Sequence, residues 1–163
     1  MAQYARPDSD IALGGWSNPS WSRIDEVVAD DATTRTQELG GGTVLKVGLS
    51  NVQDPQVSTG HIVRFRAHKS GDGAATLNGQ LYQGITLIAG SGAQTLTTVY
   101  KTFAFTLTGC EADAISDPTD LRLWFTPTGL QDVTLTWAEL EVPDVAAKKK
   151  RGPITNIPCR RWG

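Results

Sequence analysis

The stretch LRLWFTPTGLQDVTLTWAELEV, residues 121 to 142, decides the fold of this chain. In its first part, apolar side chains recur at every second position with Arg122 and Trp124 between them, which is the period of a strand that buries one face. Pro127 to Asp132 interrupts the pattern, because proline fixes φ and the glycine that follows permits a turn. The stretch therefore predicts a hairpin of two strands.

The second strand of this hairpin has an irregular pattern. Apolar residues alternate from Val133 to Trp137, and the apolar phase then moves to Leu140 and Val142. A slip of one residue exchanges the two faces of a strand. We therefore expect a β-bulge near Ala138.

Alternating segments elsewhere raise the count to about eight strands. The clearest is HIVRFRAHKS, residues 61 to 70, in which Val63, Phe65 and Ala67 point inward. One helical turn is expected at Glu111 to Ile115, with Thr108 as its N-cap. Turn signals roughly every 8 to 12 residues are typical of an all-β, antiparallel β-sandwich.

The chain divides into three segments. Residues 1–22 are rich in glycine and proline, which predicts an extended arm without strand or helix. Its two tryptophans, Trp16 and Trp21, are expected to pack on the sandwich or on a neighbouring protein, because large exposed aromatic side chains are costly. The sandwich domain occupies residues 23–145, and residues 146–163 form a basic tail.

Charge is distributed unevenly along the chain. The tail holds six of the fifteen Lys and Arg residues and none of the seventeen acids, so it carries +6 and residues 1–145 carry −8. Six cations can neutralise phosphates, but the acidic body repels a polyanion and the tail offers one aromatic side chain for stacking, so nucleic acid is not an expected partner. Docking on an acidic neighbouring copy fits both halves of the charge pattern. The expected contact residues of the tail are Lys148, Lys149, Lys150, Arg151, Arg160, Arg161 and Trp162.

Cellular location is indicated by what the sequence lacks. No apolar run approaches the ~20 residues of a membrane span, and the start MAQYARPDSD has no signal-peptide core. We therefore expect a soluble protein made in a cytoplasm. Cys110 and Cys159 are interpreted as free thiols. The alternative, for a protein that ends outside the cell, is an intersubunit disulfide through Cys159.

No catalytic constellation is evident. His61 and His68, seven residues apart on one predicted strand, occupy opposite faces, and no nucleophile elbow or phosphate loop is present. The paired aspartates at positions 8 and 10 and at positions 30 and 31 lack the calcium-loop pattern. The sequence predicts no enzyme activity, no cofactor and no metal site.

Trp124 is the one candidate for ligand binding. It alternates outward between Leu123 and Phe125, and an exposed tryptophan on a β-sandwich is typical of a sugar-binding platform. The favoured alternative is that Trp124 lies under an arm or against a second subunit, since large exposed aromatics mark protein interfaces.

Four segments carry a resemblance to a known family. They are PDSDIALGGW at Pro7 to Trp16, IDEVVADDATTRTQ at Ile24 to Gln37, VGLSNVQDPQVSTGHIVRFRAHKS at Val47 to Ser70, and AISDPTDLRLWFT at Ala114 to Thr126. In them the chain resembles small β-sandwich virion proteins of tailed bacteriophages. The resemblance implies a jelly-roll-like sandwich with extended N- and C-terminal arms and no active-site residues. The basic tail has no counterpart in the family pattern.

The resemblance makes a capsid decoration protein the expected function. Such a protein binds the major capsid protein or other virion proteins after assembly, self-associates, and stabilises the shell by linkage. Its expected location is the virion, after synthesis in the host cytoplasm. A neck or tail subunit, and a glycan-binding module for host attachment, are the alternatives. Besides the tail contacts, the hypothetical interface contains Cys159, Trp16, Trp21 and Trp124.

Overall fold

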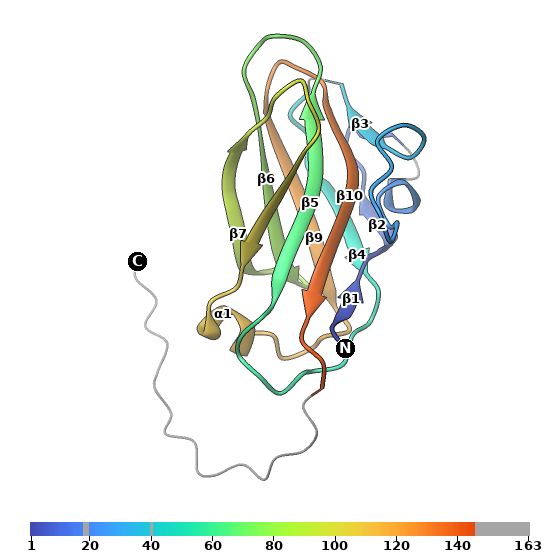
Figure 1. Ribbon diagram of the computed structural model, residues 1–163. Helices are drawn as coiled ribbons and strands as arrows, with labels where there is room; N and C mark the ends of the chain where they lie inside the picture. The colour runs from blue at the N-terminus through green and yellow to red at the C-terminus, as the bar shows by residue number, and fades with distance from the viewer. Residues whose placement is uncertain (18–19, 40, 146–163) are drawn as a thin grey trace.

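The computed structural model describes residues 1–17, 20–39 and 41–145, which form two packed antiparallel sheets (Figure 1). The first sheet has the order β1-β10-β5-β8, and β3 pairs with β10 beside β1. The second has the order β2-β4-β9-β6-β7. Sheet one contains β1 (Gln3–Ala5), β3 (Thr36–Glu38), β5 (Ile62–Lys69), β8 (Lys101–Thr106) and β10 (Val133–Val142). Sheet two contains β2 (Pro7–Ala12), β4 (Leu45–Leu49), β6 (Ala75–Gln83), β7 (Thr86–Thr95) and β9 (Leu121–Gly129). The predicted jelly-roll-like β-sandwich is confirmed.

The predicted hairpin of residues 121 to 142 is wrong in its pairing. Both strands exist, as β9 and β10, but β9 pairs with β4 and β6 whereas β10 pairs with β1, β3 and β5. The turn between them therefore crosses from one sheet to the other. Alternation reports which face of a strand is buried and not which strand lies beside it, so two strands that face each other across a core have the same pattern as a hairpin.

The expected β-bulge lies two residues earlier than Ala138. Leu135 pairs with Ala67 and Trp137 with Arg66, so two steps along β10 match one step along β5 and Thr136 is the extra residue. Ala138 then points into the core with no exposure.

On the side of β10 away from β5, the bulged part forms hydrogen bonds with a loop. Strand β3 covers Val133 to Leu135 and β1 covers Leu140 to Val142. Between them, Ala138 N–H donates to the Ile24 carbonyl at 3.0 Å and Trp137 Nε1 donates to the Glu26 carbonyl at 2.8 Å. The segment after the short 3-10 helix η1 (Trp21–Arg23) thus fills the gap between two edge strands.

The prediction that the N-terminal segment is an arm without strand or helix is wrong. Residues 1–22 supply one strand to each sheet, since β1 pairs with β10 and β2 pairs with β4. Pro7 can begin β2 because this is an edge strand, where a missing N–H removes no ladder bond. Trp16 is 5% exposed and donates from Nε1 to the Thr43 carbonyl at 2.8 Å. It belongs to this sandwich and is not available to a neighbouring subunit.

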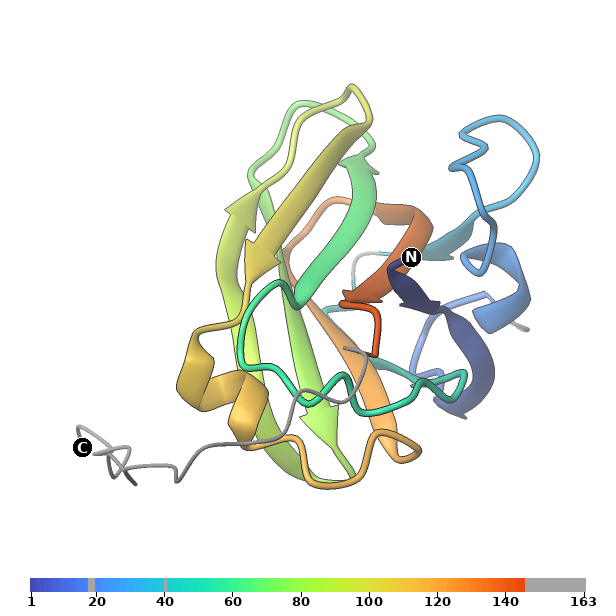
Figure 2. The same ribbon diagram turned by 60° about the horizontal axis from the view of Figure 1, so that its bottom comes forward.

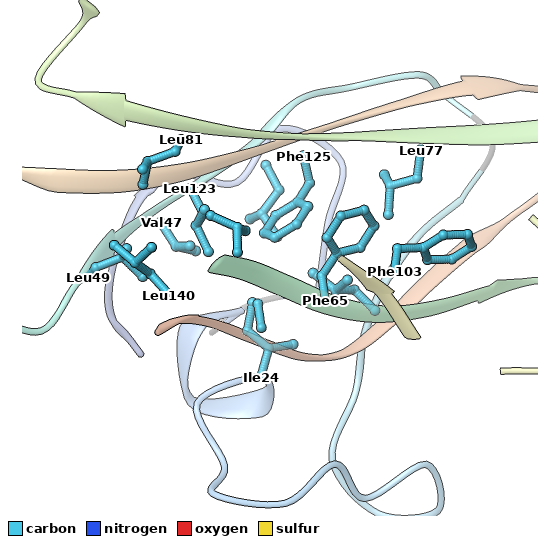
Figure 3. Packing of buried hydrophobic residues seen from close by; sticks show 14 of the residues in the cluster. Ile24, Val47, Leu49, Phe65, Leu77, Leu81, Phe103, Leu123, Phe125 and Leu140 are labelled. Atoms are coloured by element: carbon cyan, nitrogen blue, oxygen red, sulfur yellow. The ribbon is translucent and has the colours of Figure 1, made fainter. Parts of the chain in front are cut away.

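The core lies between the two sheets (Figure 3). Val63, Phe65 and Ala67 point into it as predicted, each at most 1% exposed. The Phe65 ring stacks on Phe103 at 5.4 Å between centroids and meets Phe125 edge-on at 5.5 Å. The contact with Phe125 joins strands of opposite sheets, whereas Phe103 lies beside Phe65 on the paired strand of the same sheet.

The expected helical turn is helix α1 (Gly109–Asp113), with Thr108 as its N-cap. The Thr108 hydroxyl accepts from the Glu111 N–H, and the Glu111 carboxylate accepts from the Thr108 N–H at 2.7 Å, a reciprocal capping box. Cys110 in this helix is disulfide-bonded, so its interpretation as a free thiol is wrong. Cys159 lies outside the described residues, as does the whole predicted tail of residues 146–163.

Candidate functional site

The outer face of the second sheet carries a compact group of polar and aromatic side chains. Strands β4, β9 and β6 lie side by side there, and their alternate residues leave the core side and face outward. The register places Lys46 opposite Trp124 and Trp124 opposite Gln80, while Arg122 lies opposite Tyr82. We call this surface the Trp124 face; it contains Lys46, Gln80, Tyr82, Arg122 and Trp124.

Trp124 stands between two neighbours on this face. The Tyr82 ring stacks on it with centroids 3.8 Å apart and an interplanar angle of 16°. Lys46 Nζ lies 3.8 Å from the indole centroid. Because β4 and β6 flank β9 on opposite sides, Lys46 and Tyr82 cover opposite faces of the indole. Trp124 is half-buried, and its Nε1 is buried with no hydrogen-bond partner among the described residues.

A shallow pocket of about 320 Å³ adjoins the Trp124 face. Gly48 lines it, and a Cβ at this position would lie 2.4 Å from the Ser9 hydroxyl oxygen, so the bare backbone is what lets Ser9 pack there. The Arg122 guanidinium borders the pocket and donates to Asp120 Oδ1 at 2.8 and 3.1 Å. Charged donors and acceptors therefore lie directly beside the aromatic pair.

The other predicted site residues are not brought to this face. Trp16 is buried in the sandwich. Trp21 is half-buried in η1, packs against the core, and its N–H donates to Asp10 Oδ1 at 2.9 Å. The tail residues Lys148, Lys149, Lys150, Arg151, Cys159, Arg160, Arg161 and Trp162 lie outside the described residues.

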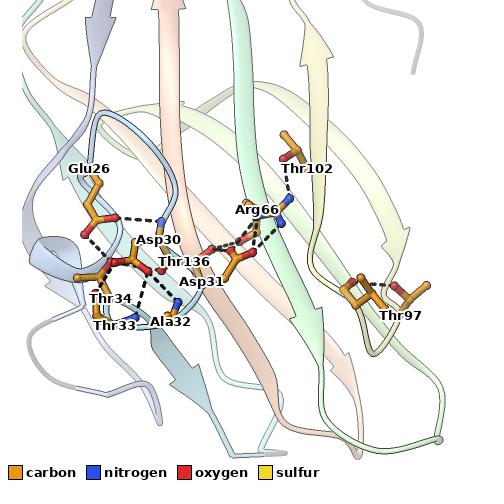
Figure 4. Close-up of polar contacts among 11 residues, drawn as sticks. Glu26, Asp30, Asp31, Ala32, Thr33, Thr34, Arg66, Thr97, Thr102 and Thr136 are labelled. Carbon is orange, nitrogen blue, oxygen red and sulfur yellow. Dashed lines mark hydrogen bonds and ion pairs between the residues drawn. The ribbon is translucent and has the colours of Figure 1, made fainter.

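The acidic pairs serve the fold. Asp10 accepts hydrogen bonds from backbone N–H groups at the start of η1, and Asp30 accepts from N–H groups of its own loop. Asp31 accepts from the Arg66 guanidinium at 2.6 to 3.1 Å and from the Thr136 hydroxyl at 3.1 Å (Figure 4). The Arg66 hydrogen bonds lower the pKa of Asp31. Within the described ranges, no group of three or more His, Cys, Asp or Glu side chains is placed to hold a metal ion.

No helix in the described part of the chain has the length and apolar character needed to cross a membrane.

Tyr82 is a site residue that the sequence interpretation missed. Leu77 and Leu81 point inward from β6, so the period of two assigns Tyr82 to the outer face. That signal is sufficient to place the tyrosine on an outer face. The pairing of β6 with β9, which brings Tyr82 to Trp124, has no local signature because the two strands are separated by about forty residues.

Comparisons with known proteins show the fold. No protein-family model matches the chain, and no curated protein sequence matches it. Among solved structures, the C-terminal CBM6 of LamC, a marine laminarinase from Zobellia galactanivorans, has a TM-score of 0.51 at 9% identity, over 88% of this chain and 100% of that chain. The carbohydrate-binding module CBM6cm-2 from Cellvibrio mixtus lichenase 5A, solved with cellotriose, has a TM-score of 0.50 at 12% identity, over 86% and 97%. A cyclase from Fischerella sp. TAU has a TM-score of 0.50 at 16% identity, over 90% and 75%. The same sandwich therefore occurs in proteins of different activities.

Proposed function

We propose that this chain is a non-catalytic carbohydrate-binding module whose ligand lies on the Trp124 face. The observation that carries the proposal is the stacked pair of Tyr82 and Trp124 on an open sheet surface, bordered by a shallow polar pocket. Aromatic side chains offer the apolar surface on which the C–H face of a sugar ring packs. Arg122, Asp120 and Gln80 supply the hydrogen-bonding groups that sugar hydroxyls require.

The Lys46 ammonium group lies over the indole of Trp124, and a ligand can displace it. At the protein surface a cation over an aromatic ring contributes only about 0.5 to 1 kcal/mol, and the lysine has a long, flexible side chain. A sugar ring can therefore take the place of the ammonium group over Trp124, while Tyr82 supports the other side of the indole. Two of the structures with the same fold are named as carbohydrate-binding modules, which supports the proposal.

Calorimetric titration with cellotriose and with laminarin oligosaccharides tests the proposal, together with a glycan array. Trp124→Ala and Tyr82→Ala are expected to abolish binding, and Lys46→Met is expected to retain it. Tyr4→Ala is the matched control, because Tyr4 is 44% exposed on β1 of the other sheet. An array without any bound glycan, or equal affinity of the Trp124→Ala protein, would overturn the assignment.

Membership of a phage particle is a second proposal that rests on other features. It is supported by the sequence resemblance and by the division of charge between residues 1–145, at −8, and the final eighteen residues, at +6. A capsid decoration protein, or a neck or tail subunit, can also carry a glycan site. Antibody labelling of particles imaged by electron microscopy tests this proposal: label over the shell supports decoration, label at one vertex indicates the neck or tail, and unlabelled particles refute it.

A further inference from the structure

A second pocket lies at the end of the sandwich, away from the Trp124 face. Figure 2 shows this end, where α1 and the long loop between β4 and β5 lie together. The pocket has a volume of about 630 Å³, within the roughly 300 to 1,000 Å³ of small-molecule sites. Ser58 Oγ donates to Asp113 Oδ1 at 2.6 Å, which fastens the loop to α1 and fixes the two walls.

His61 is the buried polar group of this pocket. It lines the pocket, is 3% exposed, and its Nδ1 is buried with no hydrogen-bond partner among the described residues. Burial lowers the pKa of His61, so the ring is neutral at neutral pH. A neutral imidazole has one nitrogen that donates and one that accepts. A buried ring nitrogen without a partner is costly, and a ligand in the pocket can supply a polar group to the imidazole.

The charged residues around the pocket determine whether a cationic or an anionic ligand is favoured. Asp54 and Asp113 line it, and both lie close enough to raise the pKa of His61 against the effect of burial. The described lining residues include no Lys or Arg. An anionic ligand is therefore disfavoured and a cation is favoured.

One part of the remaining wall is apolar. Val52, Leu121 and Val142 are each at most 8% exposed and line the pocket with the half-buried Ile115. Such side chains accept a hydrocarbon body and offer no partners to a second charged group.

We propose that this pocket binds a small organic amine with an apolar body. The ammonium group donates a hydrogen bond to the His61 imidazole and is attracted by Asp54 and Asp113, while the hydrocarbon part packs against Val52 and Leu121. This site shares Leu121 with the shallow pocket beside the Trp124 face but no residue with the face itself, and its variants at positions 54, 61 and 113 leave the Trp124 face intact, so the two tests are separate.

Cyclohexylamine is the test probe, and cyclohexanol is its neutral counterpart of nearly equal shape. The full chain is titrated with each while amide and imidazole signals are followed by NMR. We expect saturable shifts at His61, Ser58 and Asp113 with the amine, and weaker binding of the alcohol. Asp54→Asn and Asp113→Asn are each expected to weaken amine binding about two- to fivefold. Asp72→Asn, an exposed acid in the turn at the opposite end, is the control and leaves the affinity unchanged.

His61→Phe tests the hydrogen bond, with amine binding expected to fall to or below that of cyclohexanol. His61→Gln keeps a neutral acceptor and is expected to retain part of the preference for the amine, which separates the polar contact from a packing defect. Core methyl signals verify the fold of each variant. Equal affinity for amine and alcohol, shifts spread outside the pocket, or unchanged binding in both Asn variants would refute the amine site.

Discussion

Gly79 and Phe65 are in contact across the core, from opposite sheets. A Cβ added to Gly79 on β6 would lie 2.6 Å from Cε1 of the Phe65 ring on β5. The Phe65 ring also contacts Phe103 and Phe125, so it has little room to move away. The bare backbone at residue 79 is therefore what allows three aromatic rings to meet at this level of the sandwich.

Gly79→Ala is expected to destabilise the protein by about 1 to 3 kcal/mol through overpacking. Urea unfolding followed by tryptophan fluorescence measures the change in the free energy of unfolding. Gly109→Ala is the matched control, because its added Cβ meets only ordinary contacts at 3.6 Å or more and lies in the first turn of α1. A Gly79→Ala protein as stable as the Gly109→Ala protein would contradict the assigned packing.

The contact between Gly79 and Phe65 illustrates which features of the fold follow from local sequence and which do not. The inward positions of Phe65 and Phe125 follow from the period of their own strands, and both are fully buried. That Gly79 must face Phe65 depends on how the two sheets are placed over each other, which alternation does not encode. The mistaken hairpin of β9 and β10 has the same origin. Each strand follows from its own pattern, but the turn between them crosses between sheets.

The candidate site is predictable to a similar extent. The alternation of β9 is by itself enough to place Trp124 on the outer face. Its stack with Tyr82 requires the β6–β9 pairing, and the burial of His61 requires the loop that closes over it. Local pattern therefore gives the direction of single side chains, and the sites arise from long-range pairing.

Asp31 anchors a loop to the first sheet, and its removal takes away the shortest hydrogen bonds of two groups, which keep only longer ones to the Arg66 carbonyl and the Thr102 hydroxyl. The Thr136 hydroxyl belongs to a residue with no exposure, and Arg66 has its closest hydrogen bonds with Asp31. Asp31→Ala is expected to cost about 1 to 3 kcal/mol of unfolding free energy at pH 7. Asp25→Ala, in the same loop but without contacts to Arg66 or Thr136, is expected to change little. Chemical denaturation at pH 7 distinguishes the two variants.

The contribution of Asp31 also depends on pH. Hydrogen bonds from Arg66 lower its pKa in the folded protein below the usual 3.8. The unfolded state therefore binds more protons as pH falls below about 4, and the stabilisation present above that pH is lost as pH passes through the folded pKa. Wild type and Asp31→Asn are expected to differ in stability at pH 7 and to converge near pH 2. A difference that is constant with pH would show that the effect is not ionic.

Glu139 is a buried carboxylate that holds two arginines on the outer side of β10. Arg6 Nη2 lies 3.0 Å and Arg64 Nη1 lies 3.4 Å from its oxygens, and Arg64 also pairs with Glu141 at 2.5 Å. Glu139→Ala is expected to cost more stability than Glu141→Ala, because Arg6 loses its ion pair only in the first case. Thermal unfolding of the two variants under one buffer condition measures the order. The reverse order would show that Arg64, and not Glu139, is the centre of this group.

His61 makes the folded protein sensitive to mild acid. Burial lowers its pKa below the usual 6.5 in the folded state, although Asp54 and Asp113 oppose the shift. As pH falls through about 6.5 the unfolded chain takes up a proton that the folded chain excludes, so stability decreases until the folded pKa is reached, by at most about 1.4 kcal/mol per pH unit. His61→Gln removes this titration, and its free energy of unfolding should fall less than that of wild type between pH 7.5 and 5.5. Urea unfolding at both pH values gives the comparison, and equal losses in the two proteins would mean that the imidazole is protonated in the fold as readily as in the unfolded chain.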